Sequence, residues 1–96
     1  MVLTLEDCIA LSELTPEEVD AIAEHEHLPE IIAAELGNYL VHCADGTVRI
    51  RRMIGDDIAA AQAHGDHAHA ARLKLVLNHF LETHPDARRK PAAGGR

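Results

Sequence analysis

The strongest constraint on the fold is a helix start at residues 14–19, which read LTPEEV. Thr15 is placed to cap the helix, Pro16 suits the first helical position, and Glu18 completes a capping box three residues after Thr15. The leucine and valine at the two ends of this segment occupy the positions of a hydrophobic staple. A helix is therefore predicted to begin at Pro16.

Further helices are predicted on both sides of this start. Thr4 is a weaker capping signal and predicts a helix over residues 5–13. Pro29 is expected to end the second helix just before it and to open a third. The Gly65-Asp66 pair fits a tight turn, with the aspartate capping a last helix that ends before His84.

Two readings are open for residues 39–52. An Asp-Gly pair between two short apolar runs is typical of a β-hairpin turn. Isoleucine at every fourth position from Ile50 to Ile58 instead favours a loop followed by a helix, capped by Asp45 or Thr47. We predict an all-α compact bundle of four to five short helices, with an α+β fold containing a small hairpin around residues 39–52 as the alternative.

The core is predicted to be aliphatic, because Tyr39 and Phe80 are the only aromatic residues. The third helix is apolar around much of its circumference, so we expect it to be the central helix of the bundle. The predicted core consists of Ile9, Leu14, Val19, Ile22, Ile32, Leu36, Leu40, Ile54, Ile58, Leu73, Val76, Leu77 and Phe80.

One domain is expected from the length of 96 residues. We assign residues 1–84 to a single helical domain and residues 85–96, which lack an apolar period, to a disordered C-terminal tail. No apolar stretch reaches the length of a membrane span, and Glu6 and Asp7 interrupt any leader-like run. We therefore expect a cytoplasmic protein without a membrane partner.

The charge of the chain argues against nucleic acid as a partner. Sixteen acidic and nine basic side chains leave a net charge of −7, which repels phosphate backbones. A helix-turn-helix would use residues 31–40 as its recognition helix, and this segment has no basic residue. Protonation of all eight histidines would change the net charge from −7 to +1 (−7 + 8), so association is expected to respond to mild acidification.

Two groups of histidines are candidates for metal binding. Glu24 and His27 form an E-x-x-H pair of the kind that helical di-metal sites use. His64, His67 and His69 surround the predicted turn and are candidate ligands for zinc or another divalent transition metal. Solvated histidines are the simpler interpretation, and no cofactor is expected.

The remaining polar residues of interest lie inside apolar or basic segments. His42 and His79 are expected at the core or its boundary, with ring nitrogens bonded to backbone or carboxylate groups. Arg49, Arg51 and Arg52 form a basic run that is expected to pair with acidic residues of other helices. In the functional interpretation, the same run is an anion-binding or acidic-partner surface.

No catalytic residue is assigned, because the chain lacks a nucleophile motif and a glycine-rich phosphate loop. Our first hypothesis is a small non-enzymatic helical interaction module that self-associates through apolar positions in excess of the core. These positions are Leu3, Leu5, Leu11, Val41 and Leu75. A metal- or pH-responsive helical protein using the clustered histidines is the alternative, and a small ligand-binding protein or enzyme is the second alternative.

Overall fold

The computed structural model describes residues 14–88. Over this range the chain forms four α-helices and one short 3-10 helix: α2 (Pro16–Glu26), α3 (Glu30–Val41), α4 (Gly46–Ala63), α5 (His67–Thr83) and η1 (Pro85–Arg88). This confirms the prediction of an all-α compact bundle. The helix predicted over residues 5–13, including Ile9, lies outside the described residues.

The predicted helix starts form as their sequence signals require. The Glu18 amide donates to Thr15 Oγ1 at 3.1 Å, and the Thr15 amide donates to Glu18 Oε1 at 2.9 Å, so both bonds of the capping box are present. Asp66 caps α5 by accepting from the His69 amide at 3.2 Å. Gly65 has φ +76°, the left-handed conformation that glycine adopts without strain.

The segment from residue 39 to residue 52 is helical at both ends with a short loop between, so the hairpin alternative is wrong. Asp45 precedes α4 as expected, but its side chain does not cap the helix. The reason is its left-handed backbone, with φ 62°, whereas a capping side chain normally sits on extended backbone. Thr47 lies inside α4 and does not cap it either.

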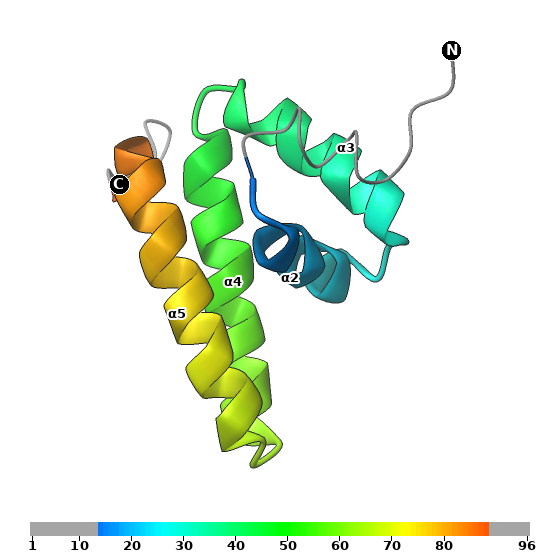
Figure 1. The fold of residues 1–96 in the computed structure, drawn as a ribbon, viewed down its shortest axis with the longest axis vertical. Coiled ribbons are helices and arrows are strands. Elements are labelled where there is room, and N and C mark those ends of the chain that lie inside the picture. Colours follow the sequence, from blue (N-terminus) through cyan, green and yellow to red (C-terminus); the bar gives the residue numbers. More distant parts are fainter. Residues whose placement is uncertain (1–13, 89–96) are drawn as a thin grey trace.

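The central helix is α4, not α3 as predicted. Helix α4 contacts every other element of the described chain, whereas α3 packs mainly on α2 and α4. Figure 1 shows α4 and α5 side by side as a long hairpin, with α2 and α3 on one side of it. Between residues 14 and 88 there is no helix both long and apolar enough to cross a membrane.

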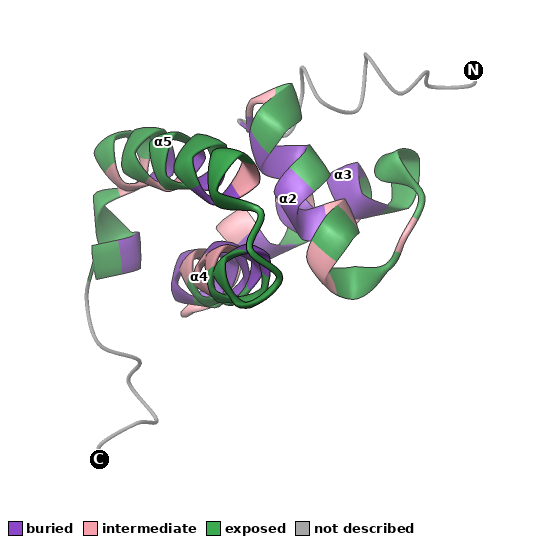
Figure 2. Cartoon of the chain, turned by 90° about the horizontal axis from the view of Figure 1, so that it is seen from below, coloured by how far each residue is buried: buried purple, intermediate pink, exposed green. Residues whose placement is uncertain are grey.

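The core follows the predicted stripe fully on α2 and in part on α4 and α5, whereas on α3 only Leu40 of the three predicted residues is buried. Buried positions gather on the inward faces of the helices in Figure 2. On α3 the buried residues are small, except for one leucine: Ala33, Ala34, Gly37 and Leu40. Ile32 is 43% exposed, and three further predicted core residues are only half-buried: Leu36, Ile58 and Leu77.

Small residues explain why this face of α3, and not the face with Ile32, is buried. They let α3 approach α2 closely. The side chain of Leu14 fills the space next to Gly37, where an added Cβ would lie 2.5 Å from Leu14 Cδ1. Placing Ile32 inward instead would force the two helices apart. Close approach therefore decides which face of α3 is buried.

Packing continues beyond the predicted domain end at residue 84. Pro85–Arg88 forms η1, and Ala87 within it is fully buried. The ring of His84 stacks on Phe80, with centroids 4.5 Å apart. The expected disordered tail therefore does not include residues 85–88, and residues 89–96 lie outside the described range.

Candidate functional site

Helix α2 is joined to α4 and α5 by three histidine–carboxylate contacts. They are His25–Asp56 at 3.0 Å, His69–Glu24 at 2.8 Å and His79–Glu18 at 3.0 Å. Every ion pair found between residues 14 and 88 involves a histidine. The polar attachment of α2 therefore depends on imidazole groups, which form ion pairs with these carboxylates only when they are protonated.

His25 bonds a carboxylate through each of its ring nitrogens. Nδ1 lies 2.7 Å from Glu26 Oε2, and Nε2 lies 3.0 Å from Asp56 Oδ2. Since ionised carboxylates only accept hydrogen bonds, both nitrogens must donate, and the ring is an imidazolium. Partial burial lowers the pKa of His25, but the hydrogen bonds to Glu26 and Asp56, together with the nearby charges of Asp57 and Glu26, raise this pKa above its ordinary value.

Glu18 is a buried carboxylate that serves two elements at once. It is only 1% exposed and closes the capping box of α2 with Thr15. Its other oxygen accepts from Nδ1 of His79 on α5. The hydrogen bond to Glu18 is the main reason that the pKa of His79 is raised.

Asp57 is a second buried carboxylate, only 5% exposed, on the inner face of α4. Its Oδ2 atom has no hydrogen-bond partner. The pKa of Asp57 is raised to about 7, mainly by burial, with the nearby charges of Glu24 and Asp56 also raising it and those of His25 and His69 lowering it. Asp57 therefore lies among the members of two interhelical pairs and takes up a proton as the pH falls through about 7.

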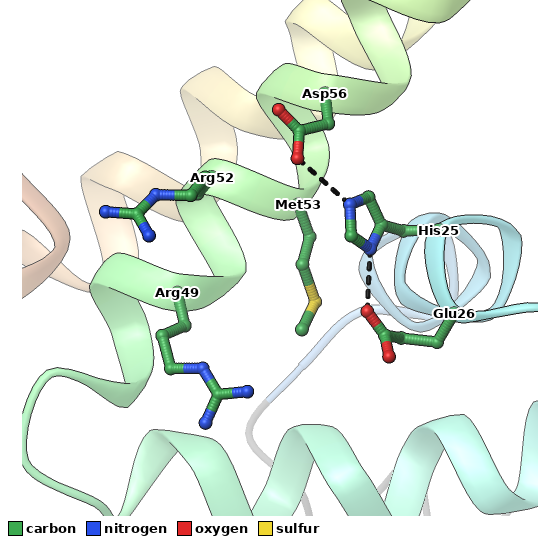
Figure 3. A pocket seen from close by; sticks show the side chains of 6 residues that line it. All are labelled: His25, Glu26, Arg49, Arg52, Met53 and Asp56. Carbon is green, nitrogen blue, oxygen red and sulfur yellow. Dashed lines mark hydrogen bonds and ion pairs between the residues drawn. The ribbon is translucent and has the colours of Figure 1, made fainter.

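A small notch lies where α2 meets α4 (Figure 3). Its volume is about 140 Å³, and it is lined by His25, Glu26, Arg49, Arg52, Met53 and Asp56. Pockets for drug-sized ligands usually measure roughly 300–1,000 Å³. The notch is therefore of a size for one small polar group and not for a nucleotide or a larger cofactor.

The structure separates most of the residues predicted as metal ligands. Glu24 bonds His69, not His27, which ends α2 in a left-handed conformation and is exposed. His64 donates from Nδ1 to the Ala60 carbonyl at 2.8 Å, and His67 is exposed. No group of three or more His, Cys, Asp or Glu side chains within residues 14–88 is arranged to hold a metal ion.

The other sequence predictions for polar residues had mixed outcomes. His42 bonds the Asn38 carbonyl at 2.8 Å and His79 bonds Glu18, as expected of their ring nitrogens, although both histidines are exposed. Within residues 14–88, the expected pairing of the arginine run with acidic residues is not seen. None of the ion pairs in the described part of the chain involves arginine.

Sequence reasoning missed the buried carboxylates of this site. Asp57 follows Ile54 by three positions and precedes Ala61 by four, so it lies on the buried stripe of α4. The signal in the sequence that could have indicated this burial is the helical spacing of Asp57 with the apolar residues of α4. Glu18 was recognised only as a capping residue, because nothing local indicates its contact with α5.

Fold and site together define a small all-α bundle held by histidine–carboxylate pairs. No protein-family model, no curated protein and no solved structure matches the chain. What the protein does must therefore follow from its own side chains.

Proposed function

We propose that the chain is a non-enzymatic helical interaction module, acting in the cytoplasm, in which the packing of α2 responds to mild changes in pH. The observation that carries this proposal is that all three polar contacts from α2 to α4 and α5 pair a histidine with a carboxylate. Protonation of His25 and His79 strengthens two of these contacts, and deprotonation weakens them.

Protonation of His25, His79 and Asp57 in each case stabilises the folded state. The raised pKa values of His25 and His79 mean that their contribution to stability is complete below the unfolded pKa of about 6.5 and is lost as pH rises through the folded pKa. Asp57, with its pKa raised to about 7, favours the folded state while it is protonated. Mild acidification therefore tightens the bundle, and mild alkalinisation loosens it.

Loosening of α2 would expose apolar surface on the rest of the bundle. Val19 and Ile22 of α2 are fully buried against the core, and α2 packs on α3, α4 and α5. An amphipathic helix of a partner protein is suited to an apolar groove of this kind. The interaction would then be favoured at the higher end of the physiological pH range.

Amide hydrogen exchange tests the proposal. Between about pH 6 and pH 8, after correction for intrinsic exchange rates, protection of α2 amides should fall more than protection of α5 amides. The His25→Gln/His79→Gln variant should remove most of this difference. His67→Gln is the matched control, because His67 is exposed on the turn before α5. Equal pH dependence in α2 and α5 would exclude a pH-responsive α2.

Two further properties belong to the same proposal. We assign no nucleic-acid partner, because the net charge of −7 opposes binding of a polyanion. The cytoplasmic assignment is supported by Cys43, a half-buried free thiol of the kind that persists in reducing compartments.

A second candidate function is self-association through the outer face of α3. Ile32 and Tyr39 are seven residues apart on this helix, so they share a face, and they are 43% and 65% exposed. A second copy of the chain could bury both side chains in a symmetric contact. Light scattering across a concentration series tests this: Ile32→Ser/Tyr39→Ser should abolish dimers, whereas loss of dimers in Leu75→Ser would assign the contact to the predicted position on α5. A monomer at all concentrations would eliminate this candidate.

A further inference from the structure

The loop between α2 and α3 is short and strained. It consists of residues 27–29, and its first residue, His27, has the left-handed conformation with φ 57° and ψ 47°. The amides of His27 and Leu28 both donate to the Ala23 carbonyl, the second at 3.1 Å. Glycine is the usual residue at such a helix end, because a side chain is disfavoured there. The turn that packs α2 against α3 is therefore held at some cost in backbone strain.

Pro29 determines what an opened form of this loop would look like. It stands immediately before α3 with φ −59°, and its ring disfavours the helical conformation for Leu28. An opened loop is therefore extended, and α2 does not join α3 in one continuous helix. Three extended residues span about 10 Å. Opening of the loop would thus carry α2 away from its own bundle.

The surface beneath α2 requires a specific occupant. Val19 and Ile22 supply two aliphatic side chains that are fully buried in the core. The polar contacts require two carboxylates and one imidazole from the occupant, because α2 pairs with α5 through Glu18 and Glu24 and with α4 through His25. A helix of another protein would have to match all five positions. The α2 helix of a second copy of the chain matches them without any change.

We propose that two copies of the chain exchange α2, so that α2 of each copy packs on α3, α4 and α5 of the other. This domain swapping rests on the loosening of α2 proposed above, and it names a second copy as the partner. The contacts of α2 are re-formed between the copies, so the exchanged dimer differs from two monomers mainly in residues 27–29. Short loops under strain promote such an exchange.

The exchanged dimer is distinct from a dimer formed through the outer face of α3. It buries the inner face of α2, whereas the other contact would bury Ile32 and Tyr39. Its formation and its dissociation both require release of α2, so exchanged dimers should persist after dilution, when an ordinary surface contact has separated. Ile32→Ser/Tyr39→Ser should therefore leave the persistent dimers unchanged.

The first test changes the strain in the loop of the full chain. The protein is incubated at high concentration at about pH 8, where α2 is proposed to be loosened, then diluted and analysed by light scattering after size-exclusion chromatography. Dimers should persist in the wild type, and His27→Gly should lower their fraction several-fold, because glycine accepts the left-handed conformation without strain. Asp45→Gly is the matched control. Asp45 also has a positive φ, of 62°, but it lies in a loop that this exchange leaves closed. No dimers, or an equal fall in both variants, would overturn the proposal.

The second test identifies the copy that α2 contacts. Glu24→Cys and His69→Cys are prepared in separate chains, each combined with Cys8→Ser/Cys43→Ser, and dimers are formed from an equal mixture. A short bismaleimide should join one chain of each kind, because Glu24 and His69 are hydrogen-bonded across α2 and α5. Tyr39→Cys in place of Glu24→Cys is the control, since α3 stays with its own copy, and it should give several-fold less product. Equal yields would contradict the exchange.

Failure of the exchange and failure of the pH-responsive α2 are distinguishable. If α2 amides lose protection with rising pH while only monomers persist after dilution, α2 loosens and the exchange is wrong. If exchanged dimers form while α2 and α5 amides show equal pH dependence, the exchange is right and the pH response is wrong. Hydrogen exchange and light scattering on the same samples separate the two results.

Discussion

Nδ1 of His79 donates to Oε2 of Glu18 at 3.0 Å, although the two residues are 61 positions apart in the sequence. The same carboxylate accepts from the Thr15 amide at 2.9 Å. One buried side chain therefore fixes both the start of α2 and the position of that start against α5. Local capping and tertiary packing are coupled at this residue.

Removal of this carboxylate should cost more than an ordinary helix cap. We expect Glu18→Ala to lower the free energy of unfolding by about 2–4 kcal/mol, since it removes a capping-box bond and a buried partner of His79. Glu17→Ala, at the exposed neighbouring position, should cost less than about 0.5 kcal/mol. Urea denaturation at about pH 6 measures both. Equal losses would show that burial of Glu18 contributes nothing.

The raised pKa of His79 predicts a pH-dependent contribution of the same pair. The folded pKa lies above the unfolded value of about 6.5, so the stabilisation is present below that value and disappears as pH rises through the folded pKa. In a double-mutant cycle with Glu18→Gln and His79→Gln, the coupling energy should be larger at about pH 5.5 than at about pH 8.5. A coupling energy that does not change with pH would contradict the assignment of an ionised pair.

Asp57 should limit the stability of the protein at neutral and alkaline pH. As pH rises from about 4 to about 7, the unfolded chain releases this proton while the folded chain retains it, so stability falls. Asp57→Asn should therefore raise the free energy of unfolding by on the order of 1–3 kcal/mol at about pH 8 and leave it nearly unchanged at about pH 4. A gain that is equal at the two pH values would argue against a titrating carboxylate. Asp86→Asn, at an exposed position of η1, is the control.

Two glycines of α4 should respond to alanine in opposite directions. At Gly46 an added Cβ would overlap the Leu40 carbonyl oxygen, whereas at Gly55 it would meet nothing within 4 Å. We expect Gly46→Ala to destabilise the protein by about 2–4 kcal/mol. Gly55→Ala should stabilise it by about 0.5–1 kcal/mol, because the unfolded chain loses freedom. Thermal denaturation of the two variants checks the pair, and a loss at Gly55 would be the contrary result.

Ile32 and Ile54 were both predicted to lie in the core, but they should differ sharply in how much they contribute to stability. Ile54 is fully buried and Ile32 is 43% exposed. Ile54→Ala is expected to cost about 2–5 kcal/mol, and Ile32→Ala less than about 1 kcal/mol. Chemical denaturation of both variants measures the difference. Similar losses would place Ile32 in the core after all.

Helix positions were predictable because their signals are local. Thr15, Glu18 and Asp66 act within three residues of themselves, and the capping bonds form as the sequence indicates. The side of α3 that faces inward was not predictable in this way. It depends on how closely α3 approaches its neighbours, which the apolar pattern of one helix does not encode.

The candidate site was predictable only in part. Glu24 and His69 were recognised in two separate motifs, but their contact spans 45 positions, and no local spacing encodes such a pairing. Arg52 and Asp56 have the four-residue spacing that commonly allows an ion pair on a helix, but Asp56 instead contacts His25 of another helix. Competition between a local and a distant partner is decided by tertiary geometry.

The inner face of α3 has consequences for how such a protein can diverge. Gly37 leaves no space for an added Cβ, and Ala33 and Ala34 are fully buried, so larger side chains at these positions are opposed by their neighbours. The opposite face, with Ile32 and Tyr39, carries little of this restriction. Descendants of one ancestral sequence could therefore keep the same interior while acquiring different specificities on the outer side of a single helix.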